Sequence, residues 1–448
     1  PQDPASSLRS SFKEVTLKQT FIDALQVINP WLTSKQSEEV FATVIAAENS
    51  GLSLLEANKE VFDRLVGTTK TTVAQNETTG EQDALVKVID FENWNNNTFT
   101  AINQFRVVTP GGPRQGIIPD IVLFVNGLPF GIVECKDVGV ADPLSSSIDQ
   151  IMRYANTRED DFGTKEGEER LFHYNLLCIA THGEEARIGT ITGEYEYYLN
   201  WKDIFPEIYR SFDINSYAAE ETIRYGANGL RNVPKVRQEV VIAGLLNKEI
   251  IVDVLRHFSI FMEIKEGVLI KVVCRYQQYR AVGKILERLR DGDSGQERSG
   301  VVWHTQGSGK SLTMVFLVRK LRSQNDLKDL KVIMTVDRID LESQLSNTAK
   351  LTNEFKESNV VKARKELVPK LSNDSSDLNM VMIHKFVQEE LKHSKALMQA
   401  FVKEGVVPEF QPFEIVNRSE RIVILLDEAH TSQGGDMGDN LFSAFPNA

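Results

Sequence analysis

The stretch Val301-Val302-Trp303-His304-Thr305-Gln306-Gly307-Ser308-Gly309-Lys310-Ser311 sets the organisation of this 448-residue chain. A short apolar run, which we expect to be a strand, ends in a glycine-rich loop, and residues 312–318 then predict a buried helix. Strand, loop and helix in this order are the context of a phosphate-binding P-loop. Glycines allow consecutive backbone N–H groups to point at phosphate oxygens, and the helix start adds its positive dipole end.

Each residue of the loop has an expected role in binding ATP. Lys310 would contact the β and γ phosphates, and the hydroxyl of Ser311 would be a ligand of Mg²⁺. The backbone that surrounds the phosphates would come from Gly307, Ser308 and Gly309. His304 stands where the full P-loop pattern has glycine, which leaves a shorter form that resembles helicase-like ATPases. The alternative is a Gly/Ser turn before an ordinary helix.

Three short β-rich runs follow the loop, at residues 332–337, 380–383 and 422–426. Because they alternate with helical segments, they predict a parallel, doubly wound sheet. The third run continues into Asp427-Glu428-Ala429-His430. At the end of a strand, Asp427 would lie near Mg²⁺ and Glu428 would activate the attacking water. A charged exit from a strand is the alternative.

A candidate for nucleotide recognition precedes the loop by some 30 residues. The stretch Arg275-Tyr276-Gln277-Gln278-Tyr279 comes before a predicted helix. The amide of Gln278 offers both a donor and an acceptor, so it can match the edge of adenine. A solvated helix start is the competing interpretation.

A second group of polar residues interrupts two apolar runs in the first half of the chain. Residues 117–125 and 128–136 read as strands that are apolar almost throughout, so both faces of their sheet should be covered. Asp120, Glu134 and Lys136 nevertheless lie within them. Three buried charges are costly unless they pair with one another or bind a metal.

The spacing of the two acids makes a testable prediction about the turn between the strands. Asn126-Gly127 is a strong signal for a two-residue hairpin turn. Such a turn alone would pair Asp120 with Val133 and place Glu134 on the other face. A metal site shared by both acids therefore requires a three-residue loop, residues 126–128, or a β-bulge in one strand. Acids on opposite faces would exclude the metal site.

The arrangement Pro119-Asp120, then Glu134-Cys135-Lys136, resembles the PD-(D/E)xK nuclease site. The resemblance implies that Asp120 and Glu134 hold Mg²⁺, which prefers oxygen ligands. The ion would polarise a phosphate and lower the pKa of a bound water, and Lys136 would orient that water or stabilise the developing charge. A buried salt bridge between Lys136 and either acid is the alternative.

Two further polar residues follow the predicted hairpin. Gln150 and Tyr154 are four positions apart, so they share one face of a predicted helix. We include both among the candidate catalytic residues, although such a pair taken alone is more often a solvated helix face.

Composition bounds the class of protein. The chain is 41% hydrophobic and 25% charged, which is ordinary for a globular protein of two or three domains. Its net charge of −12 is uneven: residues 1–240 hold 22 Lys and Arg against 35 Asp and Glu, and residues 241–448 hold 29 against 28. The chain is therefore not globally basic, and any contact with DNA must use local patches.

Cysteine usage and hydropathy predict a cytoplasmic protein without a membrane segment. Cys135, Cys178 and Cys274 are far apart, odd in number and free of metal-ligand spacing, which fits a reduced compartment. No run of about 18 apolar residues exists, and the first residues do not form a signal peptide. Residues 8–66 carry apolar residues at helical spacing and predict helices that serve packing.

Taken in order along the chain, these motifs closely resemble the restriction (R) subunit of type I restriction-modification enzymes. The order is Asp120, Glu134-Cys135-Lys136, Gln150 with Tyr154, Arg275-Tyr276 with Gln278, Gly307 to Ser311, and Asp427 to His430. The resemblance covers most of the chain. One departure is Cys135, where leucine is usual; we expect little effect because its side chain should face away from the metal.

The resemblance implies an α/β fold in two parts. Residues 1–245 would form a PD-(D/E)xK nuclease-like domain with a mixed sheet, and residues 246–448 would form the first RecA-like lobe of a superfamily 2 motor. The chain is expected to be an N-terminal fragment without the second lobe, which would bind ATP but hydrolyse it and translocate poorly.

The resemblance also implies substrates and partners. ATP hydrolysis would drive translocation of double-stranded DNA, with Mg²⁺-dependent cleavage far from the recognition site. Recognition would belong to partner specificity and modification subunits, and S-adenosylmethionine is expected only in the modification subunit.

Two other functions remain open at this stage. The first is a superfamily 2 helicase or remodelling ATPase whose N-terminal domain only binds other proteins. The second is a scaffold with an inactive nucleotide site. Asp120, Glu134 and Lys136 separate the nuclease from the first alternative, and nucleotide binding at Lys310 separates it from the second.

Overall fold

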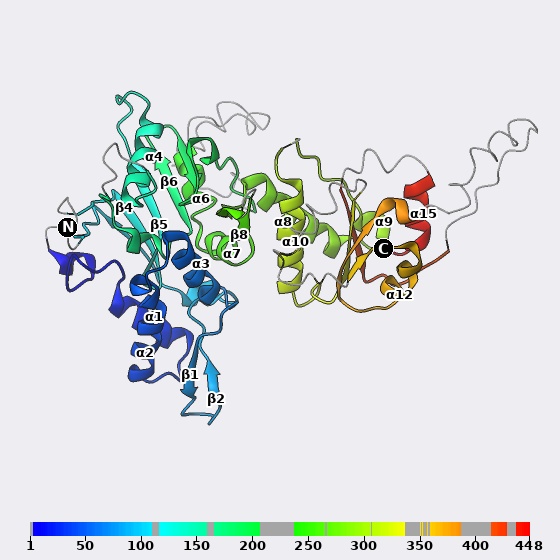
Figure 1. The fold of residues 1–448 in the computed structure, drawn as a ribbon, viewed down its shortest axis with the longest axis horizontal. Helices are drawn as coiled ribbons and strands as arrows, with labels where there is room; N and C mark the ends of the chain where they lie inside the picture. The colour runs from blue at the N-terminus through cyan, green and yellow to red at the C-terminus, as the bar shows by residue number, and fades with distance from the viewer. Residues whose placement is uncertain are drawn as a thin grey trace, which may run out of the picture. The chain divides into compact units, whose positions relative to one another are not determined.

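The computed structural model divides the chain into two compact units, Pro1–Tyr276 and Gln277–Ala448 (Figure 1). It describes residues 3–109, 116–158, 165–206, 237–264, 267–305, 307–336, 350, 352, 356, 359–386, 414–427 and 436–448. The predicted α/β class is confirmed, because a mixed sheet lies in the first unit and a parallel sheet in the second.

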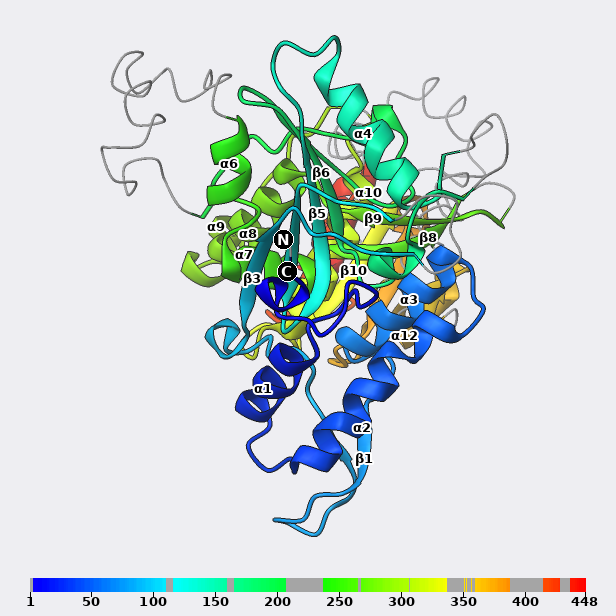
Figure 2. The same ribbon diagram turned by 90° about the vertical axis from the view of Figure 1, so that its left-hand side faces the viewer.

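A five-stranded sheet forms the centre of the first unit. Its strands are β3 (Phe99–Asn103), β4 (Ile121–Val125), β5 (Leu128–Cys135), β6 (Leu177–Thr181) and β7 (Ala186–Gly189), in that spatial order. Only β5 and β6 run parallel, and the other neighbours are antiparallel. The crossover between β5 and β6 contains α4 (Pro143–Tyr154), which packs on both strands (Figure 2). Strand β5 is therefore covered along nearly its whole length, as its apolar sequence predicts.

Three amphipathic helices precede this sheet, as their periodicity predicts. They are α1 (Lys18–Ile28), α2 (Ser34–Ile45) and α3 (Leu54–Leu65). Capping boxes begin two of them: Thr33 with Gln36 starts α2, and Ser53 with Glu56 starts α3. A small hairpin of β1 (Thr72–Gln75) and β2 (Gln82–Leu85) follows.

The hairpin of β4 and β5 contains the bulge that the sequence analysis offered as one of two solutions. Asn126 and Gly127 form a two-residue turn, with Val125 paired to Leu128. The register then shifts, so that Leu123 pairs with Gly131 and Phe130 is left as the extra residue. The three-residue loop is therefore not used, and the bulge reverses the facing of every later residue of β5.

The first unit continues beyond the boundary that we predicted after residue 245. Helix α6 (Arg237–Ala243) precedes that point, whereas α7 (Lys248–His257) and the hairpin of β8 (Ser259–Glu263) and β9 (Leu269–Val273) follow it and still belong to this unit. Lys271 of β9 explains the attachment. Its buried ammonium donates to Asn58 Oδ1 at 2.8 Å and lies against the ring of Phe62.

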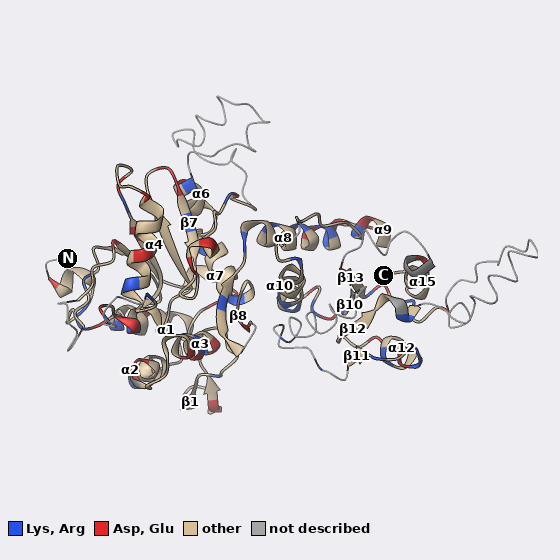
Figure 3. Cartoon of the chain, turned by 45° about the horizontal axis from the view of Figure 1, so that its top comes forward, with Lys and Arg blue, Asp and Glu red and all other residues tan. Residues whose placement is uncertain are grey.

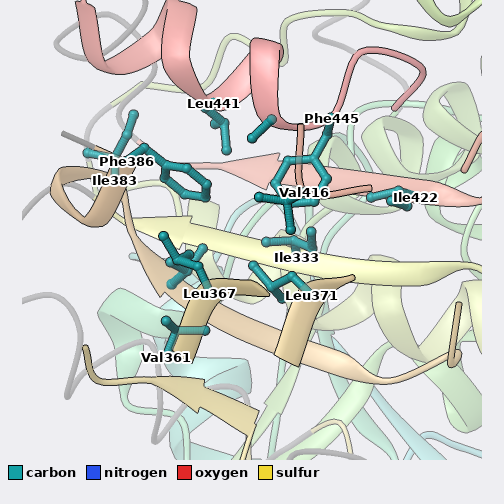
Figure 4. Close-up of a cluster of buried hydrophobic side chains, with 12 residues drawn as sticks. Ile333, Val361, Leu367, Leu371, Ile383, Phe386, Val416, Ile422, Leu441 and Phe445 are labelled. Atoms are coloured by element: carbon teal, nitrogen blue, oxygen red, sulfur yellow. The ribbon is translucent and has the colours of Figure 1, made fainter. Parts of the chain in front are cut away.

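The second unit contains a four-stranded parallel sheet in the order β11 (Val360–Val361), β12 (Leu378–Met382), β10 (Lys331–Val336) and β13 (Ile422–Leu426). The α-helices described in this unit are α8 (Tyr276–Asp291), whose first residue is the last of the first unit, α9 (Gly295–Arg298), α10 (Lys310–Ser323), α12 (Leu367–Leu371) and α15 (Asp436–Ala444). Basic residues recur along α8, and its two acidic residues lie toward its C-terminal end (Figure 3). A core cluster joins the sheet to α12 and α15, with Ile333, Leu371 and Phe445 almost fully buried (Figure 4).

One expected strand is absent from the part of the chain that the structure describes. The apolar run at residues 301–303, which we predicted to lead into the P-loop as a strand, has no regular structure. Val301 and Trp303 are 72% and 89% exposed. A strand needs a partner for its backbone groups, and no described strand pairs with this run.

Among the residues that the structure describes, no helix is both long and apolar enough to cross a membrane. Cys135, Cys178 and Cys274 are free thiols.

The β4–β5 turn provides a stability test. Gly127 has a φ of +74°, and a Cβ atom there would lie 2.4 Å from the carbonyl oxygen of Leu17. We expect Gly127→Ala to lower the free energy of unfolding by about 3 kcal/mol, because the left-handed backbone costs about 1 kcal/mol and the backbone clash adds more. The measurement is urea denaturation followed by circular dichroism.

Gly67→Ala is the matched control. Gly67 has a φ of +81° but nothing within 4 Å of the added Cβ, so only the conformational cost of about 1 kcal/mol applies. Equal losses for the two variants would contradict the packing of the turn against Leu17.

Candidate active site

Asp120 and Glu134 lie opposite each other on one face of the sheet. Ile121 pairs with Val133, so the next residues along the two antiparallel strands, Asp120 and Glu134, lie opposite each other. The backbone N–H of Asp120 donates to Glu134 Oε2 at 3.4 Å. Asp120 and Glu134 therefore share one face, as a common metal site requires, because the bulge at Phe130 shifts the register of β5.

Neighbouring groups fix the orientation of the Asp120 carboxylate. The backbone N–H of Cys135 donates to Oδ2 at 2.8 Å. Gln104, which the sequence analysis did not single out, donates from Nε2 to Oδ1 at 3.0 Å. The signal that could have found Gln104 is its place directly after the strand that precedes Asp120, but only the register shows that the two residues meet.

A chain of hydrogen bonds connects the remaining predicted residues of this site. Lys136 Nζ donates to Glu134 Oε1 at 3.1 Å and to Gln150 Oε1 at 2.7 Å. The amide nitrogen of Gln150 donates to the Tyr154 hydroxyl at 2.5 Å, and that hydroxyl donates to the carbonyl of Ile118 at 3.1 Å. Gln150 and Tyr154 thus hold the ammonium in place and are not a solvated helix face.

The electrostatics of the pair are unfavourable without a further cation. The side chain of Glu134 is 1% exposed, and burial, followed by the nearby charge of Asp120, raises its pKa to about 7. Burial, followed by the charge of Glu134, raises the pKa of Tyr154 to about 12, so its hydroxyl stays protonated. The alternative salt bridge is present between Lys136 and Glu134, at 3.1 Å, but the Asp120 carboxylate is a second acid on the same face.

These residues fit a divalent ion such as Mg²⁺. Both carboxylates offer oxygen ligands on the same face, and a cation would offset the burial of charge and the nearby charge of Asp120 that together raise the pKa of Glu134. Within the described ranges, no three His, Cys, Asp or Glu side chains gather as ligands. Mg²⁺ typically binds through one or two carboxylates and keeps several waters, so two acids suffice.

The P-loop has the backbone that its glycines predict. Gly307 and Gly309 have φ values of +76° and +82°, and α10 begins at Lys310, directly after the loop. Ser311 lies in the first turn of α10. The loop and the helix start therefore have the form expected of a phosphate site, although the preceding strand is missing.

Gln278 contacts the P-loop itself. Its buried amide donates to the carbonyl of Gly309 at 3.0 Å, and a longer contact of 3.4 Å reaches the carbonyl of Ser308. We expected this amide to face adenine. Its contact with the loop depends on the fold and could not be predicted from the sequence. Gln278 therefore lies beside the P-loop, and its recognition of adenine stays a prediction.

Two buried polar atoms of this region have no hydrogen-bond partner in the described part of the chain, Ser308 Oγ and His304 Nδ1. Unsatisfied buried groups are costly and are typical of sites that receive a ligand. Burial lowers the pKa of His304. Asp427 follows β13 as predicted, with its N–H bonded to the carbonyl of Thr335 at 3.0 Å, whereas Glu428 lies outside the described residues.

Family comparisons match both units. Residues 1–197 match the family of the type I restriction enzyme R protein N terminus, and residues 277–448 match the SWI2/SNF2 ATPase family. The second match begins at the first residue of the second structural unit.

Individual relatives extend over both units. The chain is 28% identical, over 99% of its length and 39% of the relative's, to the putative MjaIXP endonuclease subunit of a type I restriction enzyme from Methanocaldococcus jannaschii. It is 29% identical, over 95% of its length and 36% of the relative's, to the HindI endonuclease subunit of a type I restriction enzyme from Haemophilus influenzae. The chain thus spans about two fifths of the length of these relatives.

The similarity runs through the carboxylate site and the P-loop and leaves no large segment of the chain uncovered. Residues 1–197 thus resemble the N terminus of type I restriction enzyme R proteins and residues 277–448 resemble SWI2/SNF2 ATPases, and nearly the whole chain is similar to endonuclease subunits of type I restriction enzymes.

Proposed function

We propose that the chain supplies the nuclease and part of the motor of a type I restriction enzyme, which translocates double-stranded DNA with ATP and cleaves it with Mg²⁺. The observation that carries the nuclease assignment is the pairing of Asp120 with buried Glu134 on one face, beside Lys136. Its partners would be the modification and specificity subunits, in the cytoplasm, with S-adenosylmethionine bound only by the modification subunit.

In the nuclease reaction, Asp120 and Glu134 would hold the ion and Lys136 would act on the phosphate. When bound, Mg²⁺ polarises the scissile phosphate and lowers the pKa of a water ligand. The Lys136 ammonium, held by Glu134 and Gln150, would donate a hydrogen bond to a phosphoryl oxygen as charge develops there. Tyr154 keeps Gln150 oriented toward Lys136 through its hydroxyl.

In the motor, the second unit would bind ATP at the P-loop. Backbone N–H groups of residues 307–309 and the ammonium of Lys310 would surround the phosphates, and Ser311 with Asp427 would hold Mg²⁺. Gln278 would keep the loop in its binding conformation through the carbonyls of Ser308 and Gly309. We retain Glu428 as the residue proposed to activate water.

The second candidate function is a helicase-like or remodelling ATPase whose first unit is a binding module. The two functions share the motor and differ at the carboxylate site. The buried, mutually repelling acids favour the nuclease, because a module that only binds proteins gains nothing from their repulsion.

Lys136→Ala separates the two functions. We expect the variant, assembled with its partner subunits, to cleave DNA at least about 100-fold more slowly, because an electrostatic contact to the transition state is lost. ATP hydrolysis should be unchanged. The measurements are conversion of circular DNA to linear DNA and release of phosphate.

Lys35→Ala is the control, because the Lys35 side chain is 89% exposed. It should retain both activities. Undiminished cleavage by Lys136→Ala would favour the binding module over the nuclease.

The raised pKa of Glu134 predicts how pH affects metal binding. Below about pH 7 the carboxyl is protonated and competes with the ion, so Mn²⁺ should bind more tightly as pH rises through 7. In the metal-free chain, the same shift contributes stability that is complete below about pH 4.3 and is lost as pH rises through about 7.

Glu134→Gln should make both the Mn²⁺ affinity and the free energy of unfolding less dependent on pH. Binding is measured by calorimetry with Mn²⁺ in the absence of nucleotide, and stability by urea denaturation. Identical pH profiles for the natural chain and Glu134→Gln would show that another group governs the metal site.

A further inference from the structure

The row of polar residues at the carboxylate site extends onto a third strand. Asn103 of β3 pairs with Ile121 of β4, so Gln104 lies opposite Asp120 on the same face. Asp120 in turn lies opposite Glu134. Gln104, Asp120 and Glu134 therefore stand side by side across three neighbouring strands.

Gln104 contacts Asp120 at two points. Its backbone N–H donates to the Asp120 carbonyl at 2.7 Å, and its side-chain amide donates to Oδ1 at 3.0 Å. The other carboxylate oxygen, Oδ2, accepts from the Cys135 N–H. Donors thus hold both oxygens of the carboxylate, and each oxygen keeps a second acceptor position for another ligand.

The backbone of Gln104 adopts an uncommon conformation to make these contacts. Its φ is +49°, in the left-handed region that residues with a side chain rarely occupy. Such a conformation costs about 1 kcal/mol or more and persists where surrounding contacts require it, often beside functional groups. Here it occurs at the point where β3 ends and the amide reaches Asp120.

We propose that Gln104 is a positioning residue that holds the Asp120 carboxylate in the orientation needed to bind the divalent ion. This proposal rests on the proposed nuclease site. A neutral amide suits the task, because it donates a hydrogen bond without cancelling the negative charge that attracts the ion. A lysine or arginine at this position would offset that charge and compete with the metal.

Two substitutions separate the amide from the backbone. Gln104→Ala removes the side-chain donor but keeps the cost of the left-handed backbone. Gln104→Gly removes the same donor and adopts a φ of +49° without steric cost. If the amide positions Asp120, both variants should bind Mn²⁺ about 10-fold more weakly, as loss of an outer partner of a metal ligand typically does.

The test measures Mn²⁺ binding to the full 448-residue chain by calorimetry, without nucleotide, so that the Ser311 site lacks the phosphates it needs. Cleavage by the assembled enzyme is then followed against Mg²⁺ concentration. Half-maximal cleavage should require about 10-fold more Mg²⁺ in both variants, with an unchanged KM for DNA. Gln75→Ala is the control, because the exposed Gln75 amide donates to Gly80 in a separate hairpin.

Three outcomes would overturn the proposal. Unchanged Mn²⁺ affinity in both variants excludes positioning by Gln104. Weaker binding in Gln104→Ala but not in Gln104→Gly assigns the effect to the backbone. A raised KM for DNA with unchanged metal affinity makes Gln104 a substrate contact.

Asp120→Asn distinguishes failure of this proposal from failure of the nuclease site. If Asp120→Asn loses Mn²⁺ binding while the Gln104 variants keep it, the metal site stands and Gln104 has no part in it. If Asp120→Asn keeps Mn²⁺ binding, the metal site itself is wrong.

Discussion

Two carboxylates held opposite each other in a desolvated sheet are the constraint on which the first unit depends. Asp120 and Glu134 face each other because the bulge at Phe130 shifts the register of β5. Burial of Glu134 then raises its pKa to about 7. An arrangement this unfavourable persists only if the surrounding fold holds it rigidly, and the bonds from Cys135 and Lys136 do so.

The sequence predicted either a three-residue loop or a bulge, because side chains alternate with a period of two, and the structure contains the bulge. Asn126-Gly127 indicated a two-residue turn, whereas the spacing of Asp120 and Glu134 required an odd number of residues in the loop if the strands were regular. A bulge in one strand keeps the two-residue turn and still brings the two acids opposite each other. The position of the bulge was not predictable, because Phe130 is one of several apolar residues of β5 that pack in the same way. Gln104 was missed for a related reason: its meeting with Asp120 depends on the register between β3 and β4, which no motif in the sequence determines.

The backbone of the P-loop was easier to predict than the strand expected before it, because the loop depends on local chemistry. Glycines determine backbone angles by themselves, so the positive φ values of Gly307 and Gly309 followed from the motif. A strand depends on a partner, and the apolar run at residues 301–303 has none among the described strands. The domain boundary likewise depended on a buried lysine, Lys271, whose hydrogen bond to Asn58 no local pattern indicates.

Charge links the carboxylate site to the proposed substrate. Asp120, Glu134 and Lys136 together carry about −1 when ionised, and the first 240 residues have an excess of acids. A phosphodiester is also negative, so the metal-free site would repel DNA. With a divalent ion bound, Asp120, Glu134 and Lys136 would form a site with a local charge of about +1. On the proposed function, Asp120 and Glu134 would then attract a phosphate, through the ion that they hold, to the place where Lys136 can reach it, while other surfaces would have to hold the duplex.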